Sequence, residues 1–237
     1  MQTRATLATT ALLLAAAVAA GCGEAETTTT AERPASGPEF SDPTRIDNPY
    51  APLTEFRRCV LEGTSDEGSE RVVRTLLDRT EPFEVGGRQV DVAVVEDRAF
   101  IDGELAERTL DCFAQADDGT VHYFGEDVDN YENGELANHD GSFRFGEDTD
   151  HLGVLMPPDP QVGDEWYFEN APPITVEEDR VTAKLPSAEV AGERYEDVIR
   201  VRELIDGEEI EPKLYARGVG VIQELPPDGE AHLVRCA

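Results

Sequence analysis

Hydrophobic and polar residues alternate in several short segments, as they do in β-strands with one buried face. In residues 90–94 (VDVAV) the valines fall on one face. In residues 198–205 (VIRVRELI), Ile199 and Val201 share a face and Arg200 lies on the other. This pattern predicts strands of a sheet with one wet side. Further short strands are expected at residues 56–63, 120–124 and 213–216.

Turn-forming dipeptides separate these segments. Asn or Asp followed by Gly is favoured at the centre of a type I′ hairpin turn, because both positions take positive φ. Hairpin turns between segments of alternating polarity predict an antiparallel meander. Six pairs of this kind occur and a Gly-Gly pair adds a seventh turn: Asp102-Gly103, Asp118-Gly119, Asn133-Gly134, Asp140-Gly141, Asp206-Gly207, Asp228-Gly229 and Gly86-Gly87.

Helical patterns are scarce. After Cys22, no segment of about 12 residues keeps apolar residues at the i, i+3, i+4, i+7 spacing of an amphipathic helix, and prolines interrupt most candidates. We therefore expect a mainly β fold with few or short helices, an antiparallel meander that forms one curved sheet or an open barrel. Residues 43–237 are expected to form a single domain, in which residues 156–160 (MPPDP) are a rigid loop.

The N-terminal residues 1–21 are typical of a secretory signal peptide. The apolar run at residues 11–20 is too short for a bilayer, which needs about 20 apolar residues. The sequence Ala-Ala-Gly-Cys ending at Cys22 resembles a bacterial lipobox, which predicts lipidation of Cys22. The alternative is an ordinary secretory signal that is cleaved before a cysteine. The polar residues 22–42 predict a disordered tether, so we expect a lipid-anchored protein on the extracytoplasmic face of the plasma membrane.

The chain is strongly acidic, with a formal net charge of −31 and 51 Asp and Glu against 20 Lys and Arg. Such a surface argues against nucleic acid as a partner, because phosphates require basic patches. It also disfavours electrostatic docking to anionic lipids, so the acyl chains on Cys22 are expected to supply the membrane affinity. The carboxylates have two interpretations: a solvated surface that maintains solubility, or ligands that collect divalent cations.

Three cysteines follow Cys22, which leaves one thiol over if a disulfide forms outside the cytoplasm. A bond between Cys59 and Cys236 would tie the two ends of the domain together, and this pair is favoured. Cys112 is the alternative partner. A catalytic cysteine is disfavoured, because an exported nucleophilic thiol is exposed to oxidation.

The acidic loop at residues 126–133 is a candidate calcium site. Asp127, Asp129 and Glu132 could supply the several oxygens that calcium needs. The loop lacks the glycine and the final glutamate of the standard calcium-binding loop, so a solvated hairpin is the alternative. We expect no cofactor unless this loop binds calcium.

A second group of candidate metal ligands follows within a few residues. Two histidines and nearby carboxylates could converge on zinc or another transition metal. The alternative is again a solvated loop, because nothing in the sequence fixes their geometry. The residues are His139, Asp148, Asp150 and His151.

Aromatic residues are concentrated around Trp166, in residues 163–168 (GDEWYF). One interpretation is a core anchor of the sheet. The other is the wall of a binding cavity that Trp166 forms with Phe113, Tyr123, Phe143 and Phe145.

Six segments are distinctive when taken together: residues 47–53, 123–128, 130–134, 158–166, 195–201 and 215–222. They resemble a family of uncharacterised bacterial secreted proteins and lipoproteins, many of them actinobacterial. The resemblance spans residues 46–225, and the later half is also similar to β-sheet lipoproteins of the lipid-carrier type. It implies a curved sheet and a ligand-binding role.

Hydrolase motifs such as Gly-x-Ser-x-Gly and His-Glu-x-x-His are absent from the sequence. We therefore expect a non-enzymatic, monomeric cell-envelope lipoprotein, whose surface-tethered β-domain binds a protein or a small-molecule ligand. One alternative is a carrier with an apolar or lipid ligand in a cavity under the curved sheet. The other is a calcium- or metal-binding acidic domain.

Overall fold

The computed structural model describes residues 37–205, 207–225 and 229–237. The expected signal peptide and Cys22 lie outside the described residues. In the part of the chain that is described, no helix is long and apolar enough to span a membrane.

The described residues form β-strands and connecting turns, without a helix. The strands are β1 (Arg58–Ser65), β2 (Gly68–Val85), β3 (Arg88–Ile101), β4 (Glu104–Gln115), β5 (Val121–Glu132), β6 (Glu135–Asn138), β7 (Phe143–Arg144), β8 (Gly153–Met156), β9 (Glu165–Ala171), β10 (Thr175–Val190), β11 (Glu193–Ile205), β12 (Glu208–Ala216), β13 (Gly220–Glu224) and β14 (Glu230–Cys236).

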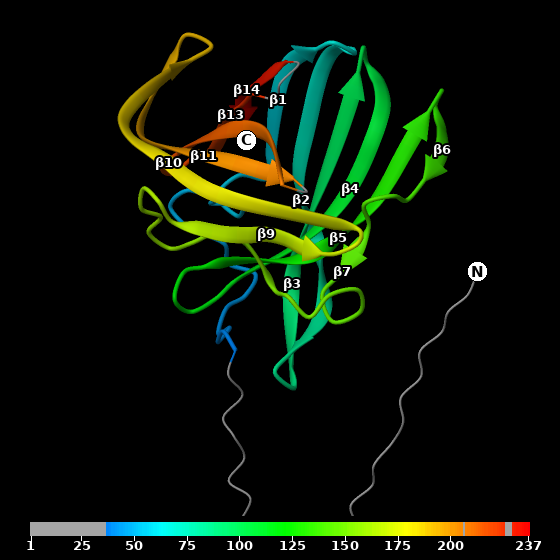
Figure 1. Cartoon of the computed structure of the whole chain (residues 1–237), viewed down its shortest axis with the longest axis vertical. Helices are drawn as coiled ribbons and strands as arrows, with labels where there is room; N and C mark the ends of the chain where they lie inside the picture. The colour runs from blue at the N-terminus through cyan, green and yellow to red at the C-terminus, as the bar shows by residue number, and fades with distance from the viewer. Residues whose placement is uncertain (1–36, 206, 226–228) are drawn as a thin grey trace, which may run out of the picture. The chain divides into compact units, whose positions relative to one another are not determined.

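These strands make one antiparallel, strongly curved sheet (Figure 1), which confirms the predicted fold class. Along the sheet the order is β6-β5-β4-β3-β2-β1-β14-β13-β12-β11-β10-β9, and the short strands β7 and β8 both pair with β5. The order follows the chain except where β1 pairs with β14. A long meander is thus joined through its first and last strands.

Local turn chemistry produces the hairpins as predicted. Gly86-Gly87, Asp102-Gly103 and Asn133-Gly134 each have positive φ at both residues, the requirement of a type I′ turn. Asp118-Gly119 and Asp140-Gly141 also lie in turns. The two remaining predicted pairs include residues outside the described part of the chain. The first strand begins two residues later than expected, at Arg58.

The disulfide joins Cys59 on β1 to Cys236 on β14, the pairing that the sequence favoured. The two cysteines are directly opposite each other in the β1–β14 ladder. These are the first and last strands of the chain, so the bond joins two residues that are 177 positions apart in the sequence. The bond therefore ties the two ends of the sheet-forming chain together, next to the seam between the halves of the meander.

Both faces of the central strands are buried. On β3, Ala93 and Val95 point into the interior core, whereas Val92 and Val94 point into the outer core on the opposite face. A third cluster packs around Leu61 and strands β11–β14. The interior core comprises Ile46, Tyr50, Ala51, Ala93, Val95, Phe113, Val121, Tyr123, Phe143, Met156, Ala171, Val181, Ile199, Val201 and Tyr215. The outer core comprises Phe83, Val85, Val90, Val92, Val94, Cys112, Ala114 and Phe124.

The folded domain begins earlier than the sequence predicted. Residues 37–42 were assigned to the tether, but Phe40 packs against the outer core. The backbone N–H and the hydroxyl of Ser41 donate to the carboxylate of Asp117 at 2.7 and 2.8 Å. These contacts, which a polar composition does not reveal, attach residues 37–42 to the sheet.

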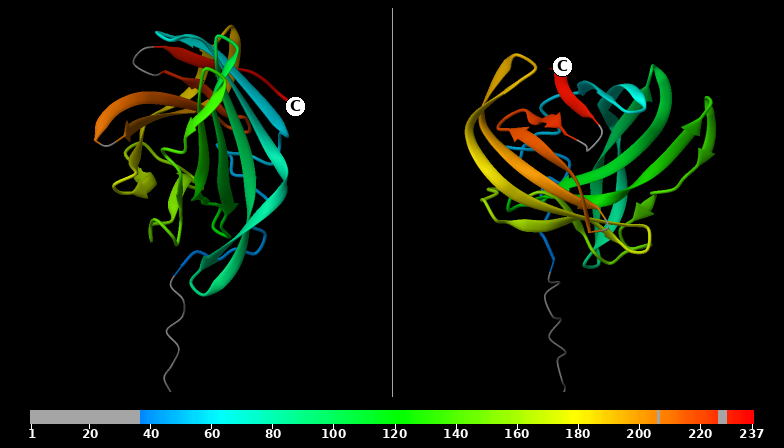
Figure 2. Two further views of the ribbon diagram at one scale, coloured as in Figure 1. Left: turned by 90° about the vertical axis from the view of Figure 1, so that its right-hand side faces the viewer. Right: turned by 45° about the horizontal axis from the view of Figure 1, so that its top comes forward.

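The curve of the sheet brings its first and last parts close together (Figures 1 and 2). Gly153 of β8 lies so near β9 that an added Cβ would be 2.2 Å from the carbonyl oxygen of Phe168. Thr149 donates a hydrogen bond to the carbonyl of Asn170 at 2.6 Å. No ladder joins β8 to β9 within the described strands, so the sheet does not close. It nevertheless wraps around an interior space.

Candidate functional site

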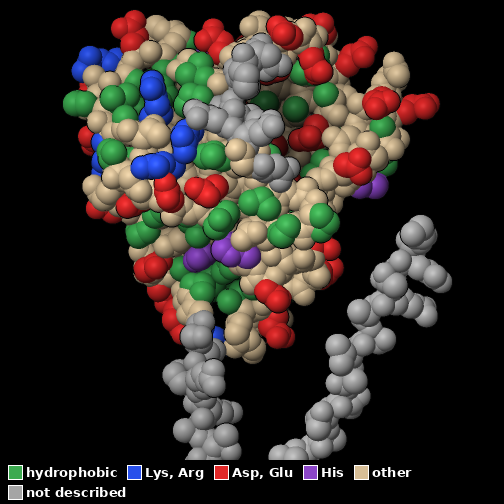
Figure 3. All heavy atoms as spheres, viewed as in Figure 1, with side chains coloured by type: hydrophobic (Ala, Val, Ile, Leu, Met, Phe, Trp, Pro, Cys, Tyr) green, Lys and Arg blue, Asp and Glu red, His purple; other side chains and the backbone are tan. Residues whose placement is uncertain are grey.

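A cavity of about 150 Å³ lies within the curve of the sheet and is called the acidic cavity below. Figure 3 shows that the molecule is hollowed on the viewed face, with acidic side chains in the hollow and around its rim. Strands β2–β5 and β8–β13 and the segment before β1 contribute to the walls. The lining residues are Tyr50, Ala51, Leu53, Arg74, Asp97, Asp111, Phe113, Tyr123, Glu126, Leu155, Phe168, Glu169, Glu177, Asp179, Glu203, Lys213, Tyr215, Gly220, Val221 and Glu224.

Negative charge dominates this lining. Among the described residues around the cavity there are eight carboxyl groups and two cationic side chains, a formal excess of six negative charges. Burying an unpaired charge is costly, and buried charges are normally paired or bound to a metal. The carboxyl groups belong to Asp97, Asp111, Glu126, Glu169, Glu177, Asp179, Glu203 and Glu224, and the cations to Arg74 and Lys213.

Strand periodicity aims one set of carboxylates inward. On β10, Glu177 and Asp179 share a face with buried Val181, and on β11 Glu203 shares a face with Val201. In the β10–β11 ladder, Asp179 is directly opposite Glu203. The ordinary alternation of these strands therefore places three acidic residues where apolar residues would be expected.

A β-bulge aims another carboxylate inward. In the β4–β5 ladder, the two-residue step from Asp111 to Phe113 faces a three-residue step from Tyr123 to Glu126. The extra residue reverses the alternation, so Tyr123 and Glu126 both face the cavity. Gly125 permits this: its φ is +108°, and an added Cβ would lie 2.2 Å from a carbonyl oxygen of β7.

Tyr123 is the centre of the aromatic part of the wall. Its ring stacks on Phe113 and Phe168, with centroid distances of 4.9 and 4.5 Å. Its hydroxyl donates to Asp111 at 2.7 Å. Aromatic faces and carboxylates thus meet at one side of the cavity.

The carboxylates around Tyr123 favour the protonated form. Burial, followed by the negative charge of Asp97, raises the pKa of Asp111 to about 7. Burial, followed by the charge of Glu169, raises the pKa of Glu126 to about 9. Burial also raises the pKa of Glu169 itself. These carboxyl groups therefore share more negative charge than their surroundings stabilise.

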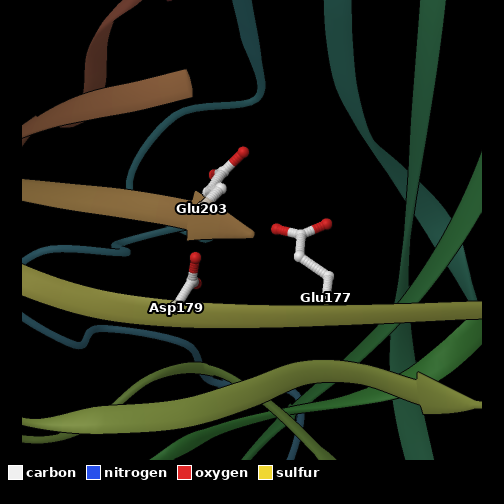
Figure 4. Close-up of side chains that lie close together, drawn as sticks. All are labelled: Glu177, Asp179 and Glu203. Carbon is white, nitrogen blue, oxygen red and sulfur yellow. The ribbon is translucent and has the colours of Figure 1, made fainter. Parts of the chain in front are cut away.

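The tightest group of acidic residues is Glu177, Asp179 and Glu203, called the carboxylate triad below (Figure 4). One carboxylate oxygen from each lies within 4.8 Å of the other two. The exposed fractions are 7%, 2% and 2%. Oε1 of Glu177 and Oδ1 of Asp179 are buried without a hydrogen-bond partner. The triad is the one group in the described chain with an arrangement that could hold a metal ion.

Two neighbours favour the charged forms of the triad. Nζ of Lys213 lies 2.7 Å from Oε1 of Glu203. Trp166 is opposite Asp179 in the β9–β10 ladder, and its indole N–H acts to lower the pKa of Asp179, although it falls short of a hydrogen bond. Burial outweighs both neighbours, so the pKa values of Glu177, Asp179 and Glu203 are all above the usual range.

The second cation of the cavity, Arg74, is committed to Asp97. Its Nε lies 3.1 and 3.0 Å from the two carboxylate oxygens, and its Nη2 lies 2.6 Å from one of them. This two-pronged geometry is typical of a strong ion pair. The two cations of the cavity lining, Arg74 and Lys213, thus contact Asp97 and Glu203, respectively.

Several residues that the sequence proposed as metal ligands instead bind cations of the protein. Asp127 accepts hydrogen bonds from Arg144 at 2.9 and 3.2 Å. Asp129 contacts Arg108 at 3.1 Å and His139 at 3.0 Å. These carboxylates lie on the outer side of the sheet and are neutralised there, so the expected calcium loop is not formed.

The other proposed ligands are dispersed. Asp148 accepts a hydrogen bond from the backbone N–H of Arg144 at 2.9 Å, while Glu132 and Asp150 are exposed. The ring of His151 packs edge-on against a tyrosine of β9. Within the described chain none of these residues belongs to a group whose ligand atoms converge. The structure therefore does not bring these proposed ligands together.

Four of the five predicted aromatic residues gather at the interior core. Phe113 and Tyr123 line the cavity, and Phe143 and Trp166 pack in or against the same core. Phe145 is also a core aromatic, but it packs against the outer core on the opposite face and does not face the cavity.

Cys112 is a buried free thiol. Burial, followed by the charge of Glu81, raises its pKa to about 12. The thiol is therefore protonated at neutral pH and packs as a small apolar side chain in the outer core.

The sequence analysis missed every carboxylate of the acidic cavity. The available signal was a break in alternation: Glu203 continues the face of Ile199 and Val201, and Asp179 precedes Val181 on the same face. A carboxylate in an apolar register indicates either a sheet edge or a buried polar site. Lys213 is one of two lysines in the chain. The scarcity of lysine did not indicate that Lys213 would be buried beside these carboxylates.

Two segments that carried the family resemblance meet in space. In the segment before β1, the carbonyl of Pro49 accepts a hydrogen bond from the backbone N–H of Gly218, and the guanidinium of Arg217 lies over the ring of Tyr50 at 5.9 Å. The β12–β13 hairpin thus holds Tyr50 against the cavity.

No protein-family model, curated protein or solved structure matches the chain. The geometry and charge of the acidic cavity are therefore the basis for a functional proposal.

Proposed function

We propose that this protein is a non-enzymatic, lipid-anchored protein of the cell envelope that binds a small, positively charged ligand in the acidic cavity. The formal excess of six carboxyl groups over cationic side chains, around a cavity of about 150 Å³, carries the proposal. A binding role at the envelope agrees with the tether and anchor expected from the sequence.

The charge of the lining selects the class of ligand. Each buried, unpaired carboxylate costs several kcal/mol relative to water, and an opposite charge offsets this cost. A cation would therefore be bound with a gain in electrostatic energy, whereas an anion would be repelled. An apolar ligand would leave the carboxylates without partners, so the geometry favours the cation over the lipid-carrier alternative.

The dimensions of the cavity limit the size of the ligand. Engineered cavities of about 150 Å³ in other proteins bind molecules the size of benzene. The acidic cavity has the same volume, so it can contain a metal ion with several water molecules or a short amine. The rings of Phe113, Tyr123 and Phe168 can contact the apolar part or the charge of an amine.

Thermal unfolding and calorimetry of the purified full chain test this proposal. Calcium, manganese and a short diamine such as putrescine represent the cations, and acetate and a fatty acid represent the anionic and apolar ligands. We expect at least one cation to raise the Tm and to bind with saturable heat, and the anions to do neither. The absence of binding by every cation would overturn the proposal.

A matched pair of variants locates the binding. Glu177→Gln combined with Asp179→Asn removes two charges from the cavity without changing side-chain size. Glu178→Gln removes one charge from the residue between them, which faces the other side of β10. We expect the double variant to lose cation binding and Glu178→Gln to retain it. Equal binding by both would place the ion on the outer surface.

The anchor is tested separately by the Cys22→Ala variant in the native host. We expect the unmodified chain to have the mass of lipid added at Cys22 and to sediment with membranes. The variant should lose both the added mass and the membrane association. A variant that keeps its mass and its location would show that lipidation is not the anchor, without affecting the proposal for the cavity.

A further inference from the structure

We propose that the carboxylate triad of Glu177, Asp179 and Glu203 is a binding site for a hard divalent metal ion, namely calcium or manganese. This inference rests on the proposed function, because it assigns the cation of the acidic cavity to one place and one chemical class. It concerns residues on β10 and β11, away from the loops that the sequence indicated.

The geometry of the triad fits a single ion. One oxygen from each side chain lies within 4.8 Å of the others. An ion at their centre would therefore lie at most about 2.8 Å from each, close to the 2.3–2.6 Å that calcium prefers. Figure 4 shows the side chains converging from the two strands. The residues come from strands rather than from a loop, and Asp179 and Glu203 are held opposite each other by the ladder. The positions of the ligands are thus fixed by the backbone of the sheet.

Unsatisfied oxygens provide an independent indication. Oε1 of Glu177 and Oδ1 of Asp179 are buried and have no hydrogen-bond partner, and both side chains are more than nine-tenths buried. Buried polar atoms are satisfied in the great majority of native structures. Two orphan oxygens in a group of three carboxylates therefore point to a ligand that accepts their lone pairs.

The net charge of the group matches a divalent ion. Three carboxylates and the ammonium of Lys213, which contacts Glu203 at 2.7 Å, carry a formal charge of −2 when all are ionised. A divalent ion would neutralise this charge, whereas a monovalent ion would leave half of it. Lys213 contacts Glu203, while Oε1 of Glu177 and Oδ1 of Asp179 have no hydrogen-bond partner.

The donor atoms select hard metals. Among the described residues that line the acidic cavity there is no histidine or cysteine, so nitrogen and sulfur ligands for zinc or copper are lacking. Carboxylate oxygens suit calcium, manganese and magnesium. Three protein ligands leave further positions for water, and the cavity has room for several water molecules. Magnesium gives up its own water reluctantly and is therefore the weaker candidate.

The position of Trp166 permits a direct test with terbium, a calcium analogue whose emission is excited through a nearby indole. Trp166 is the one tryptophan of the chain and is opposite Asp179 in the ladder. With the purified full chain, we expect saturable terbium emission on excitation of tryptophan, and displacement of the terbium by calcium and manganese. Ions bound to distant surface carboxylates are not excited efficiently and contribute little.

Three variants decide where the terbium binds. Glu177→Gln with Asp179→Asn should weaken terbium and calcium binding by well over about tenfold, a loss that can follow even from changes to residues that only orient metal ligands. Glu178→Gln should bind as the parent does. Trp166→Phe should lose the emission but keep the heat of calcium binding. Circular dichroism and the intact Cys59–Cys236 disulfide would confirm that each variant is folded.

The outcomes separate this inference from the broader proposal. Emission that survives in the Glu177→Gln, Asp179→Asn variant, or an absence of calcium heat in the parent, would overturn the metal site. Binding of putrescine without binding of calcium or manganese would overturn the metal site and support the cationic-ligand function. An absence of binding by all of these cations would overturn both.

Discussion

Carboxylates on the two faces of the sheet have opposite surroundings. On the outer face they are bound by arginines: Arg108 contacts Glu96 at 2.8 Å and Asp129 at 3.1 Å. Arg144 likewise contacts Glu81 at 2.6 Å and a second carboxylate. In the acidic cavity, eight carboxyl groups are accompanied by two cations.

The difference shows how placement, rather than composition, determines the role of an acidic residue. On the outer face, Arg108 and Arg144 each join two carboxylates. Arginine forms such forked contacts readily and loses its charge only at extreme pH. The outer carboxylates are therefore structural, whereas those of the cavity retain unsatisfied oxygens and are available to a ligand.

The largest expected effect comes from removing the internal cation. The Lys213→Met variant leaves Glu203, which is 2% exposed, without its ion-pair partner in an acidic environment. We expect the metal-free protein at pH 8 to lose about 3–5 kcal/mol of unfolding free energy, as when one partner of a buried pair is deleted. Urea unfolding in the presence of a chelator measures the loss.

An outer pair provides the matched comparison. Arg180 contacts Glu165 at 2.9 Å, and both side chains are almost half exposed. The Arg180→Met variant should therefore lose less than about 1 kcal/mol. If the two variants were destabilised equally, the distinction between the faces would be wrong. If the Lys213→Met variant is unfolded at pH 8, lowering the pH should restore part of its stability, because burial raises the pKa of Glu203 and a protonated Glu203 needs no ion-pair partner.

The next effect is a fall in stability as the pH rises from 5 to 9. The pKa of Asp111 is raised to about 7 and that of Glu126 to about 9, in both cases first by burial. A carboxyl group whose pKa is higher in the folded state stabilises that state while it is protonated, and the contribution is lost as the pH passes the folded pKa. Each group should lower the unfolding free energy by about 1.4 kcal/mol per pH unit up to its folded pKa, which is about 7 for Asp111 and about 9 for Glu126.

The outer face has the opposite dependence, which sharpens the comparison. Although burial opposes the shift, Arg108 and Arg98 lower the pKa of Glu96. Its contribution is present above the unfolded pKa, near 4, and is lost as the pH falls further. We therefore expect maximal stability near pH 5 for the metal-free protein. The Asp111→Asn variant should flatten the alkaline limb; an unchanged limb would show that Asp111 is not the titrating group.

The strands and turns could be predicted because their causes are local. A period of two along residues 90–94 and 198–205 specifies strands, and Gly86-Gly87, Asp102-Gly103 and Asn133-Gly134 specify the turns between them. The curvature and the single sheet follow from a meander without helices. Residues 37–42 were misassigned, since their attachment depends on the distant residue Asp117.

The acidic cavity could not be predicted because its causes are not local. With 51 acidic residues in the chain, a carboxylate in a strand carries little information. The convergence of Asp179, Glu203 and Lys213 depends on the registers of two ladders. The inward position of Glu126 depends on a bulge at Gly125. Only the faces that Glu203 shares with Val201 and Asp179 shares with Val181 were visible in the sequence.

A smaller effect should differ in sign between the two faces. In the metal-free protein at pH 8, Glu177→Gln removes a buried carboxylate without a full set of partners, and we expect a gain of about 1 kcal/mol in unfolding free energy. Glu96→Gln removes a carboxylate that accepts hydrogen bonds from two arginines. We expect a loss of about 1.5–3 kcal/mol for this variant, the range for hydrogen bonds to charged groups.

Urea unfolding of the two variants side by side measures this difference. Millimolar calcium should reverse the order for Glu177→Gln, because the parent gains a bound ion and the variant does not. If both substitutions destabilised the protein in the presence of a chelator, the carboxylate of Glu177 would have partners as stabilising as those of Glu96. The two faces of the sheet would then not differ in this respect.

The smallest effect is expected for an ion pair at the exposed tip of the β10–β11 hairpin. Arg194 contacts Glu196 at 2.8 Å, but both side chains are about two-thirds exposed. Water and salt screen such a pair, so Arg194→Ala should change the unfolding free energy by less than about 0.5 kcal/mol. A loss as large as that of Arg180→Met or Glu96→Gln would mean that arginine pairing stabilises the outer face wherever it occurs. A negligible loss would restrict this role to the pairs that lie over the outer core, and would leave burial as the property that distinguishes a structural carboxylate from a solvated one.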